Sequence, residues 1–217
     1  NGVATIGTLL DGLPPHSALL EDRSNMPVIR LLHDAMTLPP GVGDALGFDA
    51  PTLWIGGELI RYAHAEKIGT RDYRLSGLLR GCFGTGDALP AHDAGSEMML
   101  LEPDTLRLLD TIPASVGSVL EIEATGIGDA LPTGKSLTVT GLSIRPRIPV
   151  HGQAERLSNG DAQLNWTRRD RLVSSWSDGV DVPNSESQIE YHVQLSVAGV
   201  ERAEWTIATP ALFLTAS

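Results

Sequence analysis

The chain has 217 residues, of which 41% are hydrophobic and 20% are charged, so it can bury a core in one large domain or two smaller ones. Its 27 acidic residues outnumber 16 basic ones, and the resulting net charge of −11 disfavours nucleic acid and anionic membrane surfaces as partners. A single cysteine, Cys82, excludes an internal disulfide and a cysteine-based zinc site. No apolar run approaches the roughly twenty residues of a membrane span.

The first part of the chain contains short apolar segments separated by glycine and proline. Residues 3–13 fit a short helix or a strand equally well, because their periodicity does not distinguish the two. Residues 28–32 predict a buried strand between prolines. Gly56 and Gly57, placed between apolar pairs, predict a tight hairpin over residues 53–60, since such turns need a positive φ.

Residues 71–101 are the stretch around which we expect the chain to be organised. A strand, a glycine-rich turn, a polar excursion and an apolar return from Met98 to Leu101 predict a closed loop between two strands. Arg80 lies in the turn. We expect it to cap exposed carbonyls or to pair with a nearby acid such as Asp87 or Asp93, and anion binding is the alternative.

A change of composition follows. Residues 103–113 fit a helical turn or a strand, while residues 120–124 and 137–140 alternate as half-buried strands. The proline- and arginine-rich segment 145–151 predicts an extended connector. We therefore expect a β-rich domain over residues 1–146 and a second domain over residues 147–217.

The alternation of apolar and polar residues is clearest in the second domain. Strands are predicted at residues 162–166, 189–197, 205–207 and 212–214, and this pattern with polar turns is typical of an immunoglobulin-like β-sandwich with Trp166 as its core anchor. The domain is shorter than the roughly 100 residues of such a sandwich, so we expect it to lack its last strands. The predicted fold class of the whole chain is mainly β.

Arginines and aromatic rings gather in the second domain. Guanidinium groups can stack on indole rings and fork onto a carboxylate, which favours a structural brace across a loop. The alternatives are a basic patch that docks a neighbouring domain or subunit and, less favoured in an acidic chain, a phosphate site. The residues of the predicted brace are Trp166, Arg168, Arg169, Arg171, Trp176 and Glu186.

The sequence contains no complete catalytic motif. The pair His92 and Asp93 is isolated, and no phosphate-binding loop, dinucleotide fingerprint, serine elbow or zinc-protease helix is present. Glu121 and Glu123 share one strand face, as glycosidase carboxylates could, but a solvated face explains them as well. We therefore assign no catalytic, cofactor-binding or metal-ligating residue and interpret the chain as non-enzymatic, without a cofactor.

Two stretches resemble one known family in the same order. YRLSGLLRGCFGT, followed by His92 and Gly95, resembles the central stretch of phage tail tip and gene transfer agent baseplate hub proteins, also called host specificity proteins. LNWTRRDRLVSSWSDGVDVPNSESQIEYHVQLSV resembles the fibronectin type III module that follows in those chains. Cys82 and the polar Asn184-Ser185 pair depart from the family pattern, which puts the choice of partner in doubt.

The resemblance implies a structural module of a phage, prophage or gene transfer agent tail tip that links the tail to host-recognition parts. It implies other tail or baseplate proteins as partners, a homotrimer in the intact assembly, and a location in the virion tail after assembly in the bacterial cytoplasm. Because the chain begins with Asn1, we expect it to be part of a longer or processed polypeptide.

A carbohydrate-binding or cell-surface adhesion module is the alternative, with Trp176 or Trp205 presented to a host-surface glycan. Exposed rings would favour glycan binding, and buried rings would favour a scaffold. A cell-wall hydrolase is a third and weaker hypothesis, because it needs a cleft of converging carboxylates.

Overall fold

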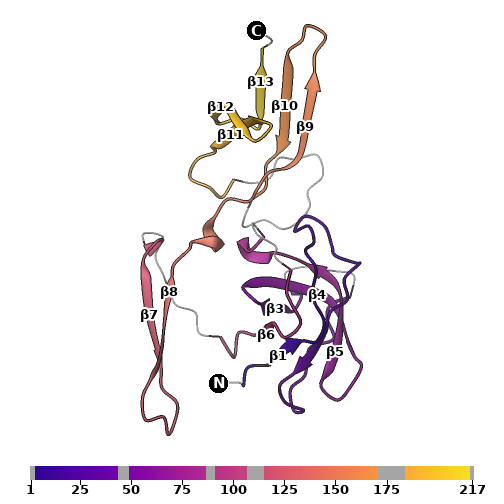
Figure 1. The fold of residues 1–217 in the computed structure, drawn as a ribbon, viewed down its shortest axis with the longest axis vertical. Coiled ribbons are helices and arrows are strands. Elements are labelled where there is room, and N and C mark those ends of the chain that lie inside the picture. The colour runs from indigo at the N-terminus through magenta and orange to yellow at the C-terminus, as the bar shows by residue number, and fades with distance from the viewer. Residues whose placement is uncertain (1–2, 44–48, 87–90, 107–114, 171–183, 216–217) are drawn as a thin grey trace. The chain divides into compact units, whose positions relative to one another are not determined.

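The computed structural model describes residues 3–43, 49–86, 91–106, 115–170 and 184–215 (Figure 1). The chain is mainly β, as predicted, and every sheet in the described residues is antiparallel. It divides into two compact units, residues 1–144 and 145–217, whereas the sequence placed the boundary after residue 146. None of the described helices has the length and apolar character needed to cross a membrane.

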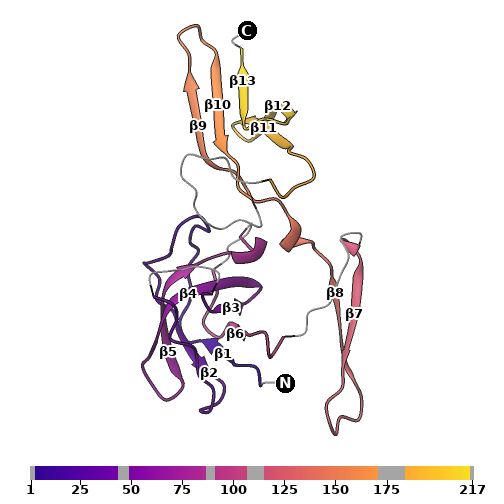
Figure 2. The ribbon, with the colours of Figure 1, turned by 180° about the vertical axis from the view of Figure 1, so that it is seen from behind.

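Six strands of the first unit form a closed barrel. They follow the order β1-β2-β5-β4-β3-β6, and β6 pairs with β1 to close the ring (Figures 1 and 2). Their bounds are β1 Ile6–Leu9, β2 Val28–Leu31, β3 Thr52–Ile55, β4 Glu58–Lys67, β5 Asp72–Leu79 and β6 Glu97–Leu101. The segment 3–13, left open by its periodicity, therefore contributes a strand.

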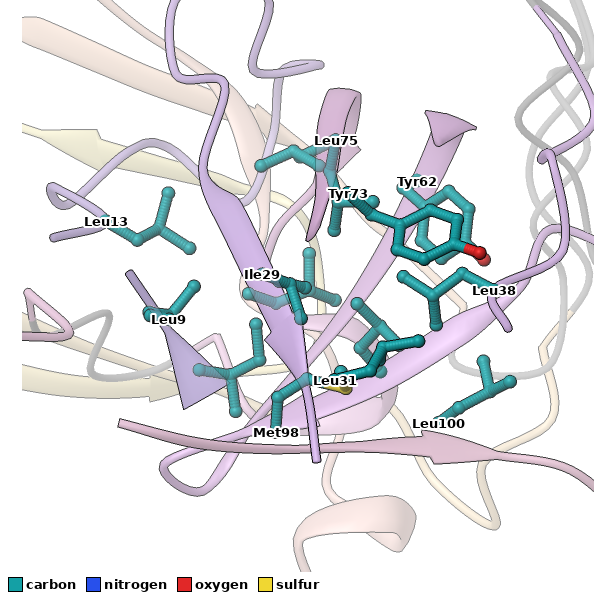
Figure 3. Packing of buried hydrophobic residues seen from close by; sticks show 14 residues of the cluster. Leu9, Leu13, Ile29, Leu31, Leu38, Tyr62, Tyr73, Leu75, Met98 and Leu100 are labelled. Carbon is teal, nitrogen blue, oxygen red and sulfur yellow. The ribbon is translucent and has the colours of Figure 1, made fainter. Parts of the chain in front are cut away.

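The barrel core follows from alternation along these strands. Successive side chains of a strand point to opposite faces, so residues two apart reach the same side. The buried pairs are Ile29 and Leu31 of β2, Leu53 and Ile55 of β3, Ile60 and Tyr62 of β4, Tyr73 and Leu75 of β5, and Met98 and Leu100 of β6. Figure 3 shows several of these side chains packed together with Leu9, Leu13 and Leu38.

Glycines allow two sharp features of the barrel. Gly56 and Gly57, with φ of 54° and 101°, form the two-residue turn between β3 and β4, in the position where the sequence predicted a hairpin. Gly77 has φ of 61°, and a Cβ built there would lie 2.7 Å from the Cβ of Ala63. The inward face of β5 switches at this glycine, because Leu75 is buried before it and Leu78 after it.

The long connection between β1 and β2 is held against the end of the barrel. Leu13 forms an isolated antiparallel bridge with His92, and Asp22 forms another with Leu78 at the end of β5. Backbone hydrogen bonds of 2.8–3.0 Å run in both directions across each bridge. These bridges bring polar side chains from distant parts of the sequence into one buried place.

The first unit also contains a two-stranded ribbon of β7 (Val119–Ala124) and β8 (Thr133–Thr138), followed by a short 3-10 helix, η3 (Leu142–Ile144). β7 lies where alternation predicted a strand, whereas β8 shares only Leu137 and Thr138 with the predicted strand 137–140. The expectation that both strands are half-buried is wrong for β8, all of whose residues are exposed. The segment 103–113, for which a helical turn or a strand was expected, lies largely outside the described residues.

The second unit has two antiparallel sheets among its described residues. One has the order β13-β10-β9 and the other pairs β11 with β12. The bounds are β9 Val150–Arg156, β10 Ala162–Thr167, β11 Tyr191–Val197, β12 Val200–Ile207 and β13 Ala211–Leu214. β9 was not predicted, because its sequence VHGQAER lacks apolar alternation. Among the described residues of this unit, Leu212 is the single hydrophobic residue that is buried.

Candidate functional site: a buried ion-pair cluster

Arg80 is the centre of a polar cluster inside the first unit. It directly follows β5, and its residue is only 2% exposed. Its Nε donates to Glu58 Oε1 at 2.7 Å, and its NH2 group donates to Glu58 Oε2 at 2.9 Å. Glu58, the first residue of β4, is also 2% exposed. The result is a bidentate guanidinium–carboxylate pair that is almost completely removed from water.

The β4–β5 register explains this pairing. Arg61 lies opposite Leu79, so continuing the antiparallel register places Arg80 level with Ile60 and diagonal to Glu58. Diagonal neighbours on one face of a sheet lie within reach of long side chains. The ion pair is thus fixed by strand pairing, although its two members are 22 residues apart.

Arg80 also reaches the connection between β1 and β2. Its NH1 group donates to the carbonyl oxygen of Pro14 at 2.9 Å and lies 3.6 Å from Asp22 Oδ2. The Asp22 carboxylate accepts further hydrogen bonds from Ser24 and Asn25, including 2.7 Å from Asn25 Nδ2. One guanidinium group therefore joins β4, the end of β5 and the long connection.

Glu58 is surrounded by donors on both oxygens. In addition to Arg80, Gly81 N donates to Oε1 at 2.9 Å, and the Nε2 of the buried His92 lies 2.7 Å from Oε2. Burial alone would raise the pKa of Glu58, but the hydrogen bonds from Arg80 and His92 outweigh it and lower the pKa. Glu58 is consequently a carboxylate at neutral pH.

The same balance applies at Asp22. Burial acts to raise its pKa, while hydrogen bonds from Asn25 and Ser24, together with the charge of His16, lower it. His16 Nε2 lies 3.7 Å from Asp22 Oδ1. Two buried carboxylates thus face one guanidinium group, with imidazole rings beside them.

Gly56 makes room for the histidine of the cluster. A Cβ built on this glycine would lie 2.9 Å from Nδ1 of His92, which is closer than real Cβ contacts. The glycine therefore serves both the β3–β4 turn and the placement of the His92 ring next to Glu58.

This chemistry is that of a structural lock. The charged groups are paired, hydrogen-bonded and buried, so a substrate could reach them only after the barrel end opened. Among the described residues, no group of three or more His, Cys, Asp or Glu side chains is arranged to hold a metal ion. The cluster can fix the connection between β1 and β2 to the barrel.

In the structure Arg80 forms an ion pair and donates a hydrogen bond to a backbone carbonyl, as the sequence predicted, but the acids that it contacts are not the ones suggested from the sequence. Its partners are Glu58 and Asp22, whereas Asp93 is exposed. Asp87 lies outside the described residues. Glu58 and Asp22 were missed because their closeness to Arg80 depends on strand pairing and not on sequence distance.

The predicted brace of the second unit is only partly described. Trp166 is half-buried and meets Tyr191 edge to face, with ring centroids 5.3 Å apart. Arg168 NH1 donates to Asn184 Oδ1 at 3.4 Å, and the same oxygen accepts Glu186 N at 3.1 Å. Arg171 and Trp176 lie outside the described residues.

Arg169 and Asp170 complete this region. Arg169 is half-buried, and its burial together with the charge of Arg147 lowers its pKa. Asp170 is 2% exposed and accepts 2.7 Å hydrogen bonds from both N and Oγ of Ser185. The sequence pointed to arginines as the groups that tie this loop, and it gave no signal for the Asp170–Ser185 contact. β10 ends at Thr167, immediately before Arg168.

A comparison with protein families matches residues 4–99 to a family described as "Rcc01698-like, C-terminal". This span is less than half of the 217 residues, and it contains nearly all of the barrel together with Asp22, Glu58, Arg80 and His92. No curated protein matches the chain. Over its barrel and buried cluster, the chain is therefore similar to the C-terminal domain of Rcc01698-like proteins.

Proposed function

We propose that this chain is a non-catalytic structural module of a phage, prophage or gene transfer agent tail tip or baseplate hub. In this role it links the tail to host-recognition parts, contacts other tail proteins and is homotrimeric in the intact particle. The proposal places the chain in the virion tail after assembly in the bacterial cytoplasm. It rests on the resemblance of the two stretches around Arg80 and Trp166 to that family.

The observation that best supports a connecting role is the lock around Arg80. The guanidinium group joins Glu58, the Pro14 carbonyl and Asp22 in one buried arrangement. Such a cluster supplies fixed geometry, because moving any one segment would leave a buried charge uncompensated. A module that transmits position between neighbouring parts needs this kind of rigidity.

The test is to locate the chain in particles from the bacterium that encodes it. A tagged chain should purify with tailed particles through a density gradient, and gold-labelled antibody should mark the tail end distal to the capsid. Purified tailed particles without the chain, or label on the capsid, would refute the proposal.

A carbohydrate-binding or adhesion module is a second proposal, supported by an exposed aromatic ring in the second unit. Phe213 on β13 is 53% exposed, whereas Trp205 on β12 is half-buried and Trp176 lies outside the described residues. A glycan array separates the two functions. Binding that Phe213→Ala abolishes would favour the adhesion module, and no binding to any glycan would argue against it.

A further inference from the structure

Two arginines of the second unit, Arg147 and Arg169, meet at one end of the sheet that contains β9 and β10. Arg169 follows the end of β10, Arg147 precedes the start of β9, and both residues are half-buried. The two strands run side by side, and Val150 pairs with Thr167 at this end (Figure 1). The antiparallel register therefore brings the residues just before Val150 next to those just after Thr167.

No counter-charge accompanies these two arginines in the described part of the unit. Neither guanidinium group forms an ion pair or donates a hydrogen bond to a described residue. The acid next in sequence, Asp170, is engaged by Ser185, whose N and Oγ both donate to its Oδ2 at 2.7 Å. Arg168, in contrast, donates to Asn184 Oδ1. The brace predicted from the sequence thus includes Arg168 but not Arg169.

This arrangement works against folding. Burial, together with the charge of Arg147, lowers the pKa of Arg169, which means that the surroundings disfavour its charged form. Partly buried charges cost free energy unless they are paired, and like charges repel each other. Proteins break such rules mainly at functional sites, where a ligand supplies the missing charge.

The backbone beside the two arginines is also distorted. The β9–β10 register shifts between Asn165 and Thr167, so that His151 and Gly152 of β9 lie opposite the single residue Trp166 of β10. His151 has a φ of 53°, in the left-handed region that residues other than glycine rarely adopt. Bulges of this kind are over-represented next to functional sites, where they change the direction of a strand and its side chains.

We propose that Arg147 and Arg169 form a binding site for a phosphate group. A guanidinium group matches two phosphate oxygens with its forked N–H donors, and two guanidinium groups balance the charge of about −2 that a phosphate monoester carries. A single carboxylate would compensate only one of the two charges. The net charge of −11 repels a long polyanion such as nucleic acid, whereas a ligand with one phosphate group responds mainly to the charges within about a Debye length.

Isothermal titration calorimetry of the full chain with inorganic phosphate, at an ionic strength held constant with sodium chloride, tests the site. The wild type should bind phosphate, and Arg147→Met and Arg169→Met should each weaken binding by about tenfold or more, since each removes charge-assisted hydrogen bonds. Arg156→Met replaces an exposed arginine at the other end of β9 and should leave binding unchanged. A wild type that does not bind phosphate, or binding that survives both arginine variants, would overturn the proposal.

Thermal unfolding distinguishes a binding site from a structural brace. Phosphate should raise the melting temperature of the second unit in the wild type but not in Arg169→Met, because a ligand stabilises only the fold that binds it. In phosphate-free buffer, Arg169→Met should not lower this temperature, because the charge that it removes has no counter-charge. A lower temperature would show that Arg169 stabilises the fold and would overturn the proposal.

A phosphate ester and free phosphate share the chemistry of this site, and a titration with glycerol phosphate separates them. Tighter binding of glycerol phosphate would assign the site to an ester, and tighter binding of inorganic phosphate would assign it to the free ion; both results support the site. The site does not depend on the proposed function. A chain that binds phosphate but is absent from tailed particles refutes only the tail function.

Discussion

Replacing Arg80 by methionine should strongly destabilise the first unit. Methionine keeps an apolar stem of similar reach but removes the guanidinium group that donates twice to Glu58 and once to the Pro14 carbonyl. Glu58 would remain buried with only His92 and Gly81 N beside it. Removing one partner of a buried ion pair typically costs about 3–5 kcal/mol, because the other charge is left uncompensated.

This cost is large compared with the total free energy of unfolding of a domain. A folded domain is stable by about 5–15 kcal/mol, so the variant should lose a substantial fraction of its stability. At about 2–4 °C per kcal/mol, we expect the melting temperature of the first unit to fall by about 6–20 °C. Urea unfolding followed by circular dichroism measures the free-energy change directly.

A matched pair in the same unit provides the control. Arg30 Nε and NH2 donate to the two carboxylate oxygens of Asp72 at 2.8 Å, which is the same bidentate geometry, but both side chains are partly accessible. Arg30→Met should therefore cost much less than Arg80→Met, because water can solvate the carboxylate left behind. Equal losses in the two variants would refute the argument that burial makes the Arg80 pair matter.

A double variant tests the mechanism further. Arg80→Met combined with Glu58→Met removes both charges of the bidentate pair, while Asp22 keeps its hydrogen bonds from Ser24 and Asn25. Replacing a buried pair by apolar residues is often neutral. The double variant should therefore be more stable than Arg80→Met alone. If the stability losses of the single variants Arg80→Met and Glu58→Met simply added in the double variant, the destabilisation would come from lost packing and not from an uncompensated charge.

Three other variants should follow the same physical rules. Because the pKa of Glu58 is lowered in the folded state, its stabilising contribution is present above its ordinary pKa of 4.5 and is lost as pH falls through the folded pKa, so Glu58→Gln should flatten the loss of stability below about pH 4.5 in acid titrations. Gly77→Ala should lower the urea midpoint much more than Gly152→Ala does. Gly77 has a positive φ, and a Cβ there would lie 2.7 Å from Ala63, whereas nothing lies within 4 Å of a Cβ built on Gly152. Equal changes of the midpoint in the two variants would contradict this. Ala198 has φ of 51° in the β11–β12 turn, so Ala198→Asn should stabilise the second unit by several tenths to about 1 kcal/mol, and a lower midpoint would refute the reasoning.

Local patterns predicted several of the individual strands. The Gly56-Gly57 hairpin and β7 depend on residues close in sequence, so turn chemistry and alternation were sufficient for them, whereas most of β8 lies in a segment rich in turn residues and was missed. The barrel was not predicted, because its closure depends on pairing between β1 and β6, and neither strand carries a signal for its partner. Nor could the sequence resolve 3–13, whose four-residue strand is too short to establish a period.

The candidate site shows the same limit. Arg80 was identified because a long charged side chain in a glycine-rich turn needs a partner. Its partner Glu58 could be named only after the β4–β5 register was known, and Asp22 only after its bridge to Leu78 was known. Sequence proximity suggested Asp93, which lies in an exposed position. Residue type was readable from the sequence, but the spatial relation of the charges was not.

The pairing of β1 with β6 has a consequence for biosynthesis. Gly7 lies opposite Met98, so the first strand of the barrel can pair with the sixth only after residues 91 positions later in the chain have been synthesised. Contacts between residues so far apart slow folding, because a long loop must close before they form. On a ribosome, the nascent barrel keeps open β edges until its sixth strand emerges, and this interval is when the chain most needs protection from aggregation.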